Sequence, residues 1–321
     1  MKVGVLTVAL YDRNRKDAME YLKNLGVEAV EIGCGGHPGD IHCKPSVLLN
    51  DDAELQKFKN DVFGNGLQIS ALSCHGNPVH PNKEVAEKFH REFIDTILLA
   101  EKLGVDTVVG FSGCPGDCPE SRFPNWVTCP WPGEFLSVLH YQWNEVLIPY
   151  WKKTAEFAKK HGVNKICLEM HPGFCVYNPE TLLKLRAAVG DVIGANFDPS
   201  HLMWQGIDPV EAIKVLGDAI YFVHGKDVRL DKANIAKNGV LDTKPYSDIM
   251  NRAWAFRTLG YGHDSKVWKD IISMLRIVGY DGVISIEHED SLMTSQEGLS
   301  KAVAFLKDVL IKDEVTDTWW A

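Results

Sequence analysis

The sequence has no long hydrophobic run and no excess of basic charge. Nowhere does an uninterrupted apolar stretch approach the roughly 18 residues that a membrane span needs. The 34 Lys and Arg residues are outnumbered by 43 Asp and Glu residues, which gives a net charge of −9. Binding to a phosphate backbone or to an anionic membrane needs clustered basic residues. We therefore expect neither nucleic acid nor a membrane as a partner.

The sequence motifs of several enzyme classes are also missing. There is no G-x-G-x-x-G after an expected strand, no P-loop and no G-x-S-x-G elbow, so nucleotide cofactors and serine hydrolysis lack support. The eight cysteines are scattered, and Cys114 and Cys118 have no second pair with which to form a zinc site. The first residues read as a strand rather than a secretion signal, because charge arrives at Asp12. Reduced thiols and a cytoplasmic location are expected.

What the sequence does contain is a regular alternation of short apolar or β-branched runs with helical patterns, which is typical of parallel sheets. The expected strands are residues 3–9, 28–33, 68–73, 106–111, 165–170, 192–197, 219–224 and 282–287. The expected helices are residues 17–25, 84–103, 150–161, 179–189, 209–216, 266–278 and 297–310. Eight such units favour a closed barrel over a doubly wound sheet. We predict a single (β/α)8 TIM barrel domain over residues 1–321.

The connections in this pattern are unequal in length. Those that follow strands are long, at residues 34–50, 74–82, 112–133 and 226–264, whereas the turns that lead from helix to strand are short. In barrels the loops after the strands build the active site at the carboxyl ends of the strands. The extended βα loops therefore place the expected site at that end.

Ligand-type residues end four of the expected strands. They are Glu169, Asp198, His224 and Glu287. Any one of them could simply cap the following helix. Four on one rim are better explained by a cation, because three converging carboxylates would repel one another without it. Three oxygen ligands and one nitrogen suit a hard to borderline ion. Mn²⁺ is the expected cofactor, with Mg²⁺ or Co²⁺ as alternatives.

The segments CLEMHPG, NFDPSHLMWQGIDP, FVHGKD and SIEHED resemble the xylose-isomerase-like barrel superfamily. This superfamily of sugar phosphate isomerases and epimerases includes ketose 3-epimerases and inosose dehydratase-type enzymes. The motifs cover the chain from about Lys165 onward, and the first half matches only by strand rhythm and by ISALSCHGNP. The resemblance implies that the four rim residues ligate the metal. It also implies that Glu169 and Glu287 are catalytic, one removing and the other returning a proton at the substrate carbon.

Two histidines are further candidates. His201 resembles the histidine of the family that binds a substrate oxygen, and its alternative role is a helix cap. His171 lies two residues after Glu169, where a continued strand would place both side chains on one face. We expect His171 to be a second catalytic base, and its alternative is a loop histidine bonded to backbone.

The cationic substrate contact departs from the family pattern. Lys226 and Arg229 both follow His224 closely, and Arg229 is the expected substrate-binding residue, with a surface ion pair as its alternative. Cys175 stands where the ketose epimerases have a substrate-contacting glutamate, and the cationic contact is displaced by one position. Both differences argue against simple ketose 3-epimerisation. Glu289 is expected to be structural.

Aromatic residues mark three other segments. The insertion at residues 254–264 is expected to be a loop that forms a substrate lid, with Trp254, Arg257 and His263 as substrate-binding residues. The alternative is a loop that only anchors itself. Trp126 and Trp131 either shape a pocket or form an oligomer contact, and the aromatics of the final TDTWWA offer a dock for a neighbouring chain.

The favoured function is a divalent-metal-dependent sugar isomerase or epimerase that abstracts a proton next to a carbonyl. The alternative is a metal-dependent 3-keto-glycoside lyase of the C-glycoside deglycosidase type. For either reaction the substrate is a small sugar or glycoside, and the chain is expected to act as a homo-oligomer or, as such a lyase, in complex with a small β-rich subunit. A third possibility, a multi-metal endonuclease with extra histidine ligands such as His37, His42, His75 and His80, is disfavoured by the acidic balance. A non-catalytic binding module is the weakest hypothesis.

Overall fold

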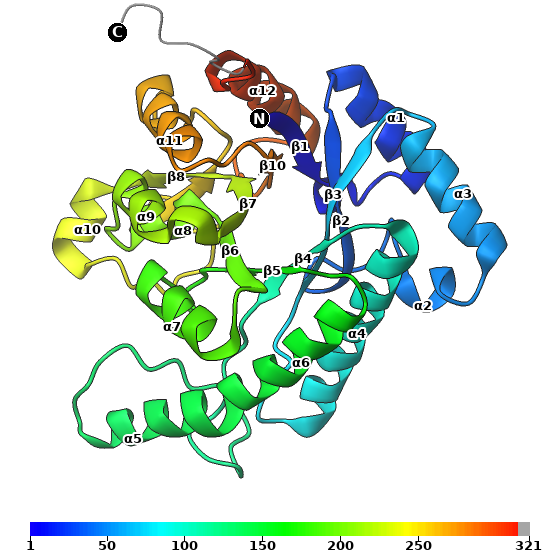
Figure 1. Ribbon diagram of the computed structural model, residues 1–321. Helices are drawn as coiled ribbons and strands as arrows, with labels where there is room; N and C mark the ends of the chain where they lie inside the picture. The colour runs from blue at the N-terminus through cyan, green and yellow to red at the C-terminus, as the bar shows by residue number, and fades with distance from the viewer. Residues whose placement is uncertain (314–321) are drawn as a thin grey trace, which may run out of the picture.

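In the computed structural model, which describes residues 1–313, eight parallel strands close into a barrel (Figure 1). Around the barrel the order is β1-β10-β7-β6-β5-β4-β3-β2. The barrel strands are β1 Lys2–Leu6, β2 Ala29–Gly36, β3 Gln68–His75, β4 Thr107–Phe111, β5 Lys165–Glu169, β6 Ile193–Phe197, β7 Ile220–Gly225 and β10 Val283–Ile286. The predicted (β/α)8 barrel is confirmed.

Helices surround the barrel on the outside (Figure 1). They are α1 Arg15–Leu25, α2 Pro45–Leu48, α3 Asp52–Phe63, α4 Lys83–Leu103, α5 Glu134–His140, α6 Ile148–Lys160, α7 Pro179–Val189, α8 Pro199–Trp204, α9 Pro209–Leu216, α10 Lys232–Asn238, α11 Ser265–Ile277 and α12 Ser295–Val309. Helix α4 shows why the sequence forms them. Asn82 caps its first turn by accepting from Glu84 N and Val85 N, and Gly104 ends the helix in the left-handed region with a φ of 70°.

The barrel interior has two layers. Ala71, Val109, Cys167 and Phe222 form a small apolar cluster that is separate from the large core between strands and helices. Because side chains two residues apart share a face, Glu169 and His224 lie on the same inner face, one step nearer the carboxyl ends of the strands. The apolar cluster thus lies directly beneath a layer of polar side chains, on the side of the amino ends of the strands.

Four segments differ from the sequence expectation. The first strand ends at Leu6, and Thr7–Leu10 form a 3-10 helix. Helix α3 was not expected, and Asp51 caps it. The helix expected at residues 150–161 begins much earlier, since α5 runs through a π-helical segment, Tyr141–Leu147, into α6.

The fourth difference is the segment at residues 226–264, which was expected to be a loop. It contains a two-stranded antiparallel sheet of β8 Asp227–Leu230 and β9 Trp254–Arg257, in which Asp227 pairs with Arg257 and Leu230 with Trp254. Within β9, Trp254 and Phe256 are buried and the residues after each are half-buried. Burial that alternates with every residue is typical of a strand that covers a core with one face. In β9 this pattern outweighs the loop-like composition of the surrounding segment.

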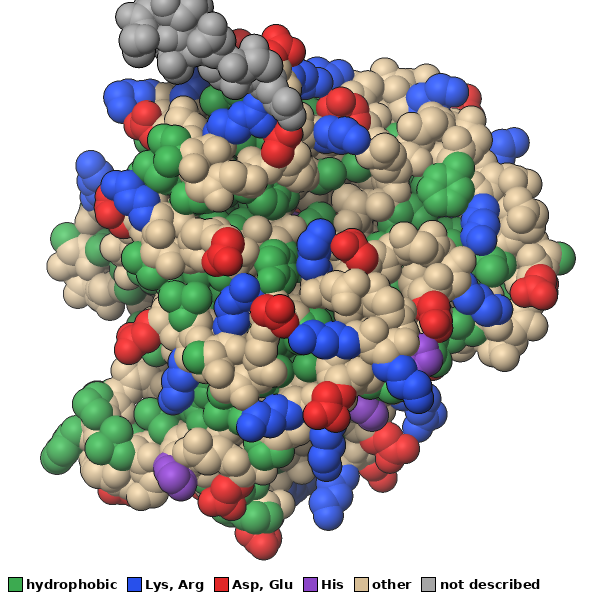
Figure 2. Space-filling model, viewed as in Figure 1, with side chains coloured by type: hydrophobic (Ala, Val, Ile, Leu, Met, Phe, Trp, Pro, Cys, Tyr) green, Lys and Arg blue, Asp and Glu red, His purple; other side chains and the backbone are tan. Residues whose placement is uncertain are grey.

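The surface carries mixed charge on the face seen in Figure 2, where acidic and basic side chains are interspersed. Hydrophobic side chains gather on the lobe around α5 in the same view. Phe123, Trp131 and Leu136 are among the exposed large apolar residues, whereas Trp126 packs edge-on against Tyr177 at 5.5 Å. None of the helices in residues 1–313 combines the length and apolar character that a membrane crossing requires. The predicted docking of Trp319 and Trp320 lies outside the described residues.

Candidate metal centre

Closure of the barrel brings the four predicted ligands together on one rim. Each offers one ligand atom, and these atoms all lie within 4.8 Å of one another. We call this set the metal cluster: Glu169, Asp198, His224 and Glu287. His224 Nδ1 lies 3.1 Å from Glu287 Oε2 and 3.4 Å from Glu169 Oε2. The chain therefore positions three carboxylates around one imidazole nitrogen.

The cluster has the properties of a cation site. Glu169, Asp198 and His224 are almost fully buried, and the side chain of Glu287 is 14% exposed. Asp198 Oδ1 accepts a hydrogen bond from Ser200 N at 2.8 Å, but its Oδ2 is buried and has no hydrogen-bond partner among residues 1–313. A buried carboxylate oxygen without a donor is costly. This oxygen lies 3.5 Å from His201 Nε2 and 3.8 Å from Lys226 Nζ, and the donor set around it fits a divalent cation.

The charges of the cluster are strongly coupled. Burial opposes ionisation of Glu169, but contacts with His201, His224 and His75 outweigh it and hold the pKa of Glu169 well below its usual value. Burial raises the pKa of Asp198 despite the nearby His201 and Lys226. Burial also disfavours the charged form of His224, yet Glu31 and other carboxylates raise its pKa well above 6.5. The negative charge of these carboxylates therefore favours a positive charge at the cluster.

Besides His224, three other histidines lie near Glu169. His201 Nε2 lies 3.1 Å from Glu169 Oε1, and His75 Nε2 lies 3.1 Å from Glu169 Oε2. The ring of His171 lies 4.1 Å from that of His201, and burial lowers the pKa of His171 to about 3. The structure thus brings both predicted histidines to the cluster.

The cationic residue at the cluster is Lys226. Its side chain is 3% exposed, and Nζ lies 2.6 Å from Glu289 Oε2, 3.2 Å from Glu287 Oε2 and 4.2 Å from the centre of the Phe256 ring. Arg229 instead points to the surface, where its side chain is 45% exposed and donates to Asp231 at 3.0 Å. Because side chains alternate along β8, Arg229 faces away from the buried Val228. The structure places Lys226, not the predicted Arg229, beside the metal cluster, and Glu289 contacts Lys226 there.

The three predicted substrate-binding residues of the insertion, Trp254, Arg257 and His263, have recorded partners outside the metal cluster. Arg257 Nε donates to Asp290 at 3.1 Å, and His263 Nδ1 lies 2.8 Å from Asp227 Oδ1. The ring of Trp254 stacks on Trp204 at 4.6 Å, and it is Phe256 whose ring meets that of His201, at 5.2 Å.

A cavity of about 430 Å³ lies beside the cluster. Its lining includes His171, Tyr246, Phe256, His288, Glu289 and Met293. The Tyr246 and Phe256 rings stack at 5.8 Å. His171 lines this cavity and also contacts His201, so the cavity adjoins side chains that surround the metal cluster. It offers both apolar ring faces and polar groups, as substrate pockets commonly do.

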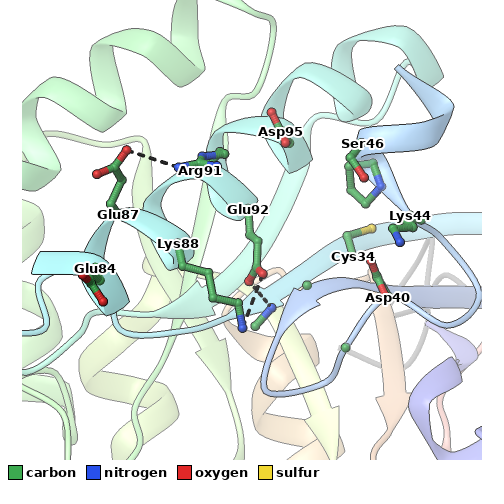
Figure 3. A pocket seen from close by; sticks show the side chains of 14 residues that line it. Cys34, Asp40, Lys44, Ser46, Glu84, Glu87, Lys88, Arg91, Glu92 and Asp95 are labelled. Atoms are coloured by element: carbon green, nitrogen blue, oxygen red, sulfur yellow. Dashed lines mark hydrogen bonds and ion pairs between the residues drawn. The ribbon is translucent and has the colours of Figure 1, made fainter. Parts of the chain in front are cut away.

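Another groove, of about 580 Å³, lies between β2 with its following loop and α4 (Figure 3). Its charged side chains pair with one another, Arg91 with Glu87 at 3.2 Å and Lys88 with Glu92 at 3.7 Å. Glu92 also accepts from Gly36 N at 2.9 Å. These contacts hold the loop after β2 against α4, and the metal cluster contributes none of the lining in the described part of the chain.

Sequence reasoning missed four buried polar residues of the site. They are Glu31, His75, Asn196 and Lys226. His75 was considered only as a nuclease ligand and Lys226 only as second to Arg229. Glu31 had a detectable signal, because it is a single acidic residue inside the apolar strand AVEIG. Asn196 precedes Asp198 by two residues and donates to Glu169 Oε2 at 3.2 Å.

The barrel and the rim cluster define a class of protein, the (β/α)8 barrel with a candidate metal centre at the carboxyl ends of its strands. Residues 19–309 match the family model described as xylose isomerase-like TIM barrel, and the chain belongs to this family.

Similar proteins cover most or part of the chain. YfiH of Bacillus subtilis (strain 168), described as an uncharacterized protein, is 40% identical over 313 residues, which are 97% of this chain and 99% of that protein. An inosose dehydratase of Clostridium botulinum (strain Alaska E43 / Type E3) is 29% identical over 170 residues. That match covers 52% of this chain and 54% of the dehydratase, so it spans about half of each.

Solved structures share the fold at lower identity. The IolI protein with a bound zinc atom has a TM-score of 0.65 and 19% identity, with 97% of this chain and 98% of that chain covered. D-psicose 3-epimerase in the presence of D-fructose has a TM-score of 0.63 and 15% identity, with 97% and 99% covered. A xylose isomerase-like TIM barrel protein from Mycobacterium smegmatis, in complex with magnesium, has a TM-score of 0.62 and 18% identity, with 97% and 98% covered.

Proposed function

We propose that this chain is a divalent-metal-dependent sugar isomerase or epimerase that removes a proton next to a carbonyl group. The observation that carries the proposal is the pair Glu169 and Glu287, which approach the same nitrogen of His224 from two strands on opposite sides of β7 and β6. Two carboxylates at one centre can take a proton from one face of a carbon and return one to the other.

The metal cluster would hold the cation, and its three oxygens and one nitrogen favour Mn²⁺, with Mg²⁺ or Co²⁺ as alternatives. When bound, the cation supplies the positive charge that stabilises negative charge developing on the substrate carbonyl oxygen. Asp198 and His224 act as ligands, whereas Glu169 and Glu287 also move protons.

Other side chains bind and orient the substrate. His201 Nε2, beside Glu169 Oε1, is placed to donate to a substrate hydroxyl. The Lys226 ammonium, beside Glu287, takes the cationic contact that the sequence assigned to Arg229. Phe256 and Tyr246 offer ring faces to the apolar face of a sugar.

Solvent isotope exchange tests this proposal. The Mn²⁺-loaded protein is incubated in deuterated water with free ketoses, phosphorylated ketoses and inososes, and deuterium in the recovered sugar is measured by mass spectrometry. We expect incorporation at a carbon next to the carbonyl and its loss in Glu287→Gln. The matched control is Glu28→Gln, at a half-buried glutamate before β2 that contacts Val3 N and Lys312. Exchange that is equal in Glu287→Gln and the unaltered protein would overturn the proposal.

A second candidate is β-elimination from a 3-keto-glycoside. It is favoured by His171, which lines the 430 Å³ cavity next to the cluster. This histidine is an additional base to which the isomerase reaction of Glu169 and Glu287 gives no role. Release of aglycone from a 3-keto-glycoside, abolished in His171→Asn, would support this reaction. Interconversion of free sugars without such release would contradict it.

We further propose a cytoplasmic location, which the eight free cysteines support, and a partner chain, either a second copy or a small β-rich subunit. The exposed apolar side chains on the α5 lobe support the proposal of a partner chain of either kind. The native mass of the purified protein tests for a second copy.

A further inference from the structure

Glu31 lies inside the barrel with its side chain fully buried. It belongs to β2, where it pairs in register with Leu6 of β1 and Ala71 of β3. An ionised carboxylate in the interior of a barrel is tolerated only where other groups satisfy it. The identity of its partners therefore shows what Glu31 does.

Those partners come from three other strands. Ser285 Oγ of β10 donates to Glu31 Oε2 at 2.6 Å, and Ser73 Oγ of β3 donates to Oε1. His224 Nε2 of β7 lies 3.0 Å from Oε2 and 3.1 Å from Oε1. Two hydroxyls and one imidazole thus share the carboxylate, and all of these side chains are buried.

The imidazole of His224 has different surroundings at its two nitrogens. Nδ1 faces the metal cluster, at 3.1 Å from Glu287 Oε2, whereas Nε2 faces Glu31. Asn196 Nδ2 lies 3.2 Å from both ring nitrogens, but an amide NH2 group can only donate. In the described residues, Glu31 is the recorded acceptor for a proton on Nε2.

We propose that Glu31 is a positioning residue for the metal centre: it holds the Nε2–H of His224 and so presents the Nδ1 lone pair to the cation. A histidine ligand binds a metal through one nitrogen and carries its proton on the other, and a carboxylate on that proton fixes the ring and strengthens the ligand. Ser73 and Ser285 fix the carboxylate in turn. This inference rests on the proposed metal centre but not on the reaction catalysed there.

The test is the affinity for Mn²⁺, measured by isothermal titration calorimetry on the full chain. Glu31→Gln keeps the size of the side chain and removes its charge, and we expect Mn²⁺ binding about 10- to 100-fold weaker. Glu28→Gln, three residues earlier, makes the same change outside the cluster and should leave the affinity unaltered. Asp198→Asn, which alters a ligand, should weaken binding as well.

These variants separate the two ideas. Unaltered affinity in Glu31→Gln, with lost affinity in Asp198→Asn, overturns the role of Glu31 and keeps the metal centre. If the unaltered protein binds no Mn²⁺, both fall. A lack of sugar chemistry with intact metal binding would count only against the proposed reaction.

A spectroscopic measurement covers the case in which Glu31→Gln fails to fold. In the Zn²⁺-loaded protein, nitrogen-15 NMR of the His224 ring should show the proton on Nε2 and the metal-bound nitrogen as Nδ1. Ser285→Ala, which removes only one donor to Glu31, should keep this tautomer with a smaller loss of affinity. A proton on Nδ1 would overturn the proposal.

Discussion

At the scale of single residues, Lys226 shows how burial changes the meaning of a charge. The sequence offered two cations after His224, and only the one that is 3% exposed lies among the carboxylates of Glu287 and Glu289. Burial disfavours the charged form of Lys226, but these carboxylates outweigh it and raise its pKa well above the usual 10.5. Lys226 is therefore a permanent positive charge beside the metal cluster.

Replacing Lys226 with Met is predicted to have opposite effects on metal binding and turnover. Loss of a cation beside the ligands strengthens binding of a divalent cation, whereas loss of a charged substrate contact, about 1.5–3 kcal/mol, lowers kcat/KM by about 10- to 100-fold. Titration calorimetry and steady-state kinetics on the substrate found by isotope exchange measure the two effects.

Arg229→Met is the matched control, because this arginine is exposed and pairs only with Asp231 among its recorded contacts in residues 1–313. We expect it to change neither quantity appreciably. Equal losses of turnover in both variants would contradict the assignment of the substrate contact to Lys226.

At the scale of elements, the insertion between β7 and α11 is anchored by buried carboxylates. Asp227 accepts from Gly260 N, Gly262 N and His263 N at 2.9–3.1 Å and contacts the His263 ring. Asp290 accepts from Thr258 N at 2.8 Å. Together with the pairing of β8 with β9, these bonds hold the insertion in place beside the cavity that Phe256 lines.

Asp227→Asn is predicted to lower the free energy of unfolding by about 2–4 kcal/mol. An amide has one acceptor oxygen, so several buried donors lose their partner, and each such loss costs about 1–3 kcal/mol. Chemical denaturation monitored by tryptophan fluorescence measures the change. Asp231→Asn, at the half-buried N-cap of α10, is the control and should cost less than about 1 kcal/mol.

The contact between Asp227 and His263 predicts a pH dependence of stability. The hydrogen bond to Asp227 raises the pKa of His263 above 6.5 in the folded chain, against the effect of burial. The stabilisation is fully present below pH 6.5 and is lost as pH rises through the raised pKa. Unfolding free energies measured from pH 6 to 9 should therefore fall more steeply for the unaltered protein than for His263→Gln. Parallel curves would show that this pair makes no pH-dependent contribution.

At the scale of the whole molecule, the metal cluster joins strands that are distant in sequence. Its four residues come from β5, β7 and the ends of β6 and β10, so a bound cation would cross-link half of the barrel. A cation at 100 times its dissociation constant stabilises the folded chain by about 2.7 kcal/mol.

Saturating Mn²⁺ is accordingly predicted to raise Tm by about 4 °C over the chelator-treated protein. Differential scanning calorimetry measures this shift. In Asp198→Asn the shift should shrink toward zero, and a full shift in that variant would mean that the cation binds elsewhere.

The sequence by itself determined the alternation of strands and helices, and therefore the barrel. It also determined that four ligand-type side chains would meet, because each stands at the end of an expected strand and parallel strands present those ends at one rim. Periodicity and position along a strand are local properties, and they sufficed to predict that Glu169, Asp198, His224 and Glu287 lie together.

Only the tertiary structure decided which of the neighbouring side chains reach that centre. Glu31 meets His224 across 193 positions of sequence, and no local pattern encodes a contact across a closed barrel. Lys226 and Arg229 differ by three positions, and the turn into β8 sends one inward and the other to solvent. Barrel closure and strand pairing set these distances, because they depend on the register of segments that are far apart in the chain.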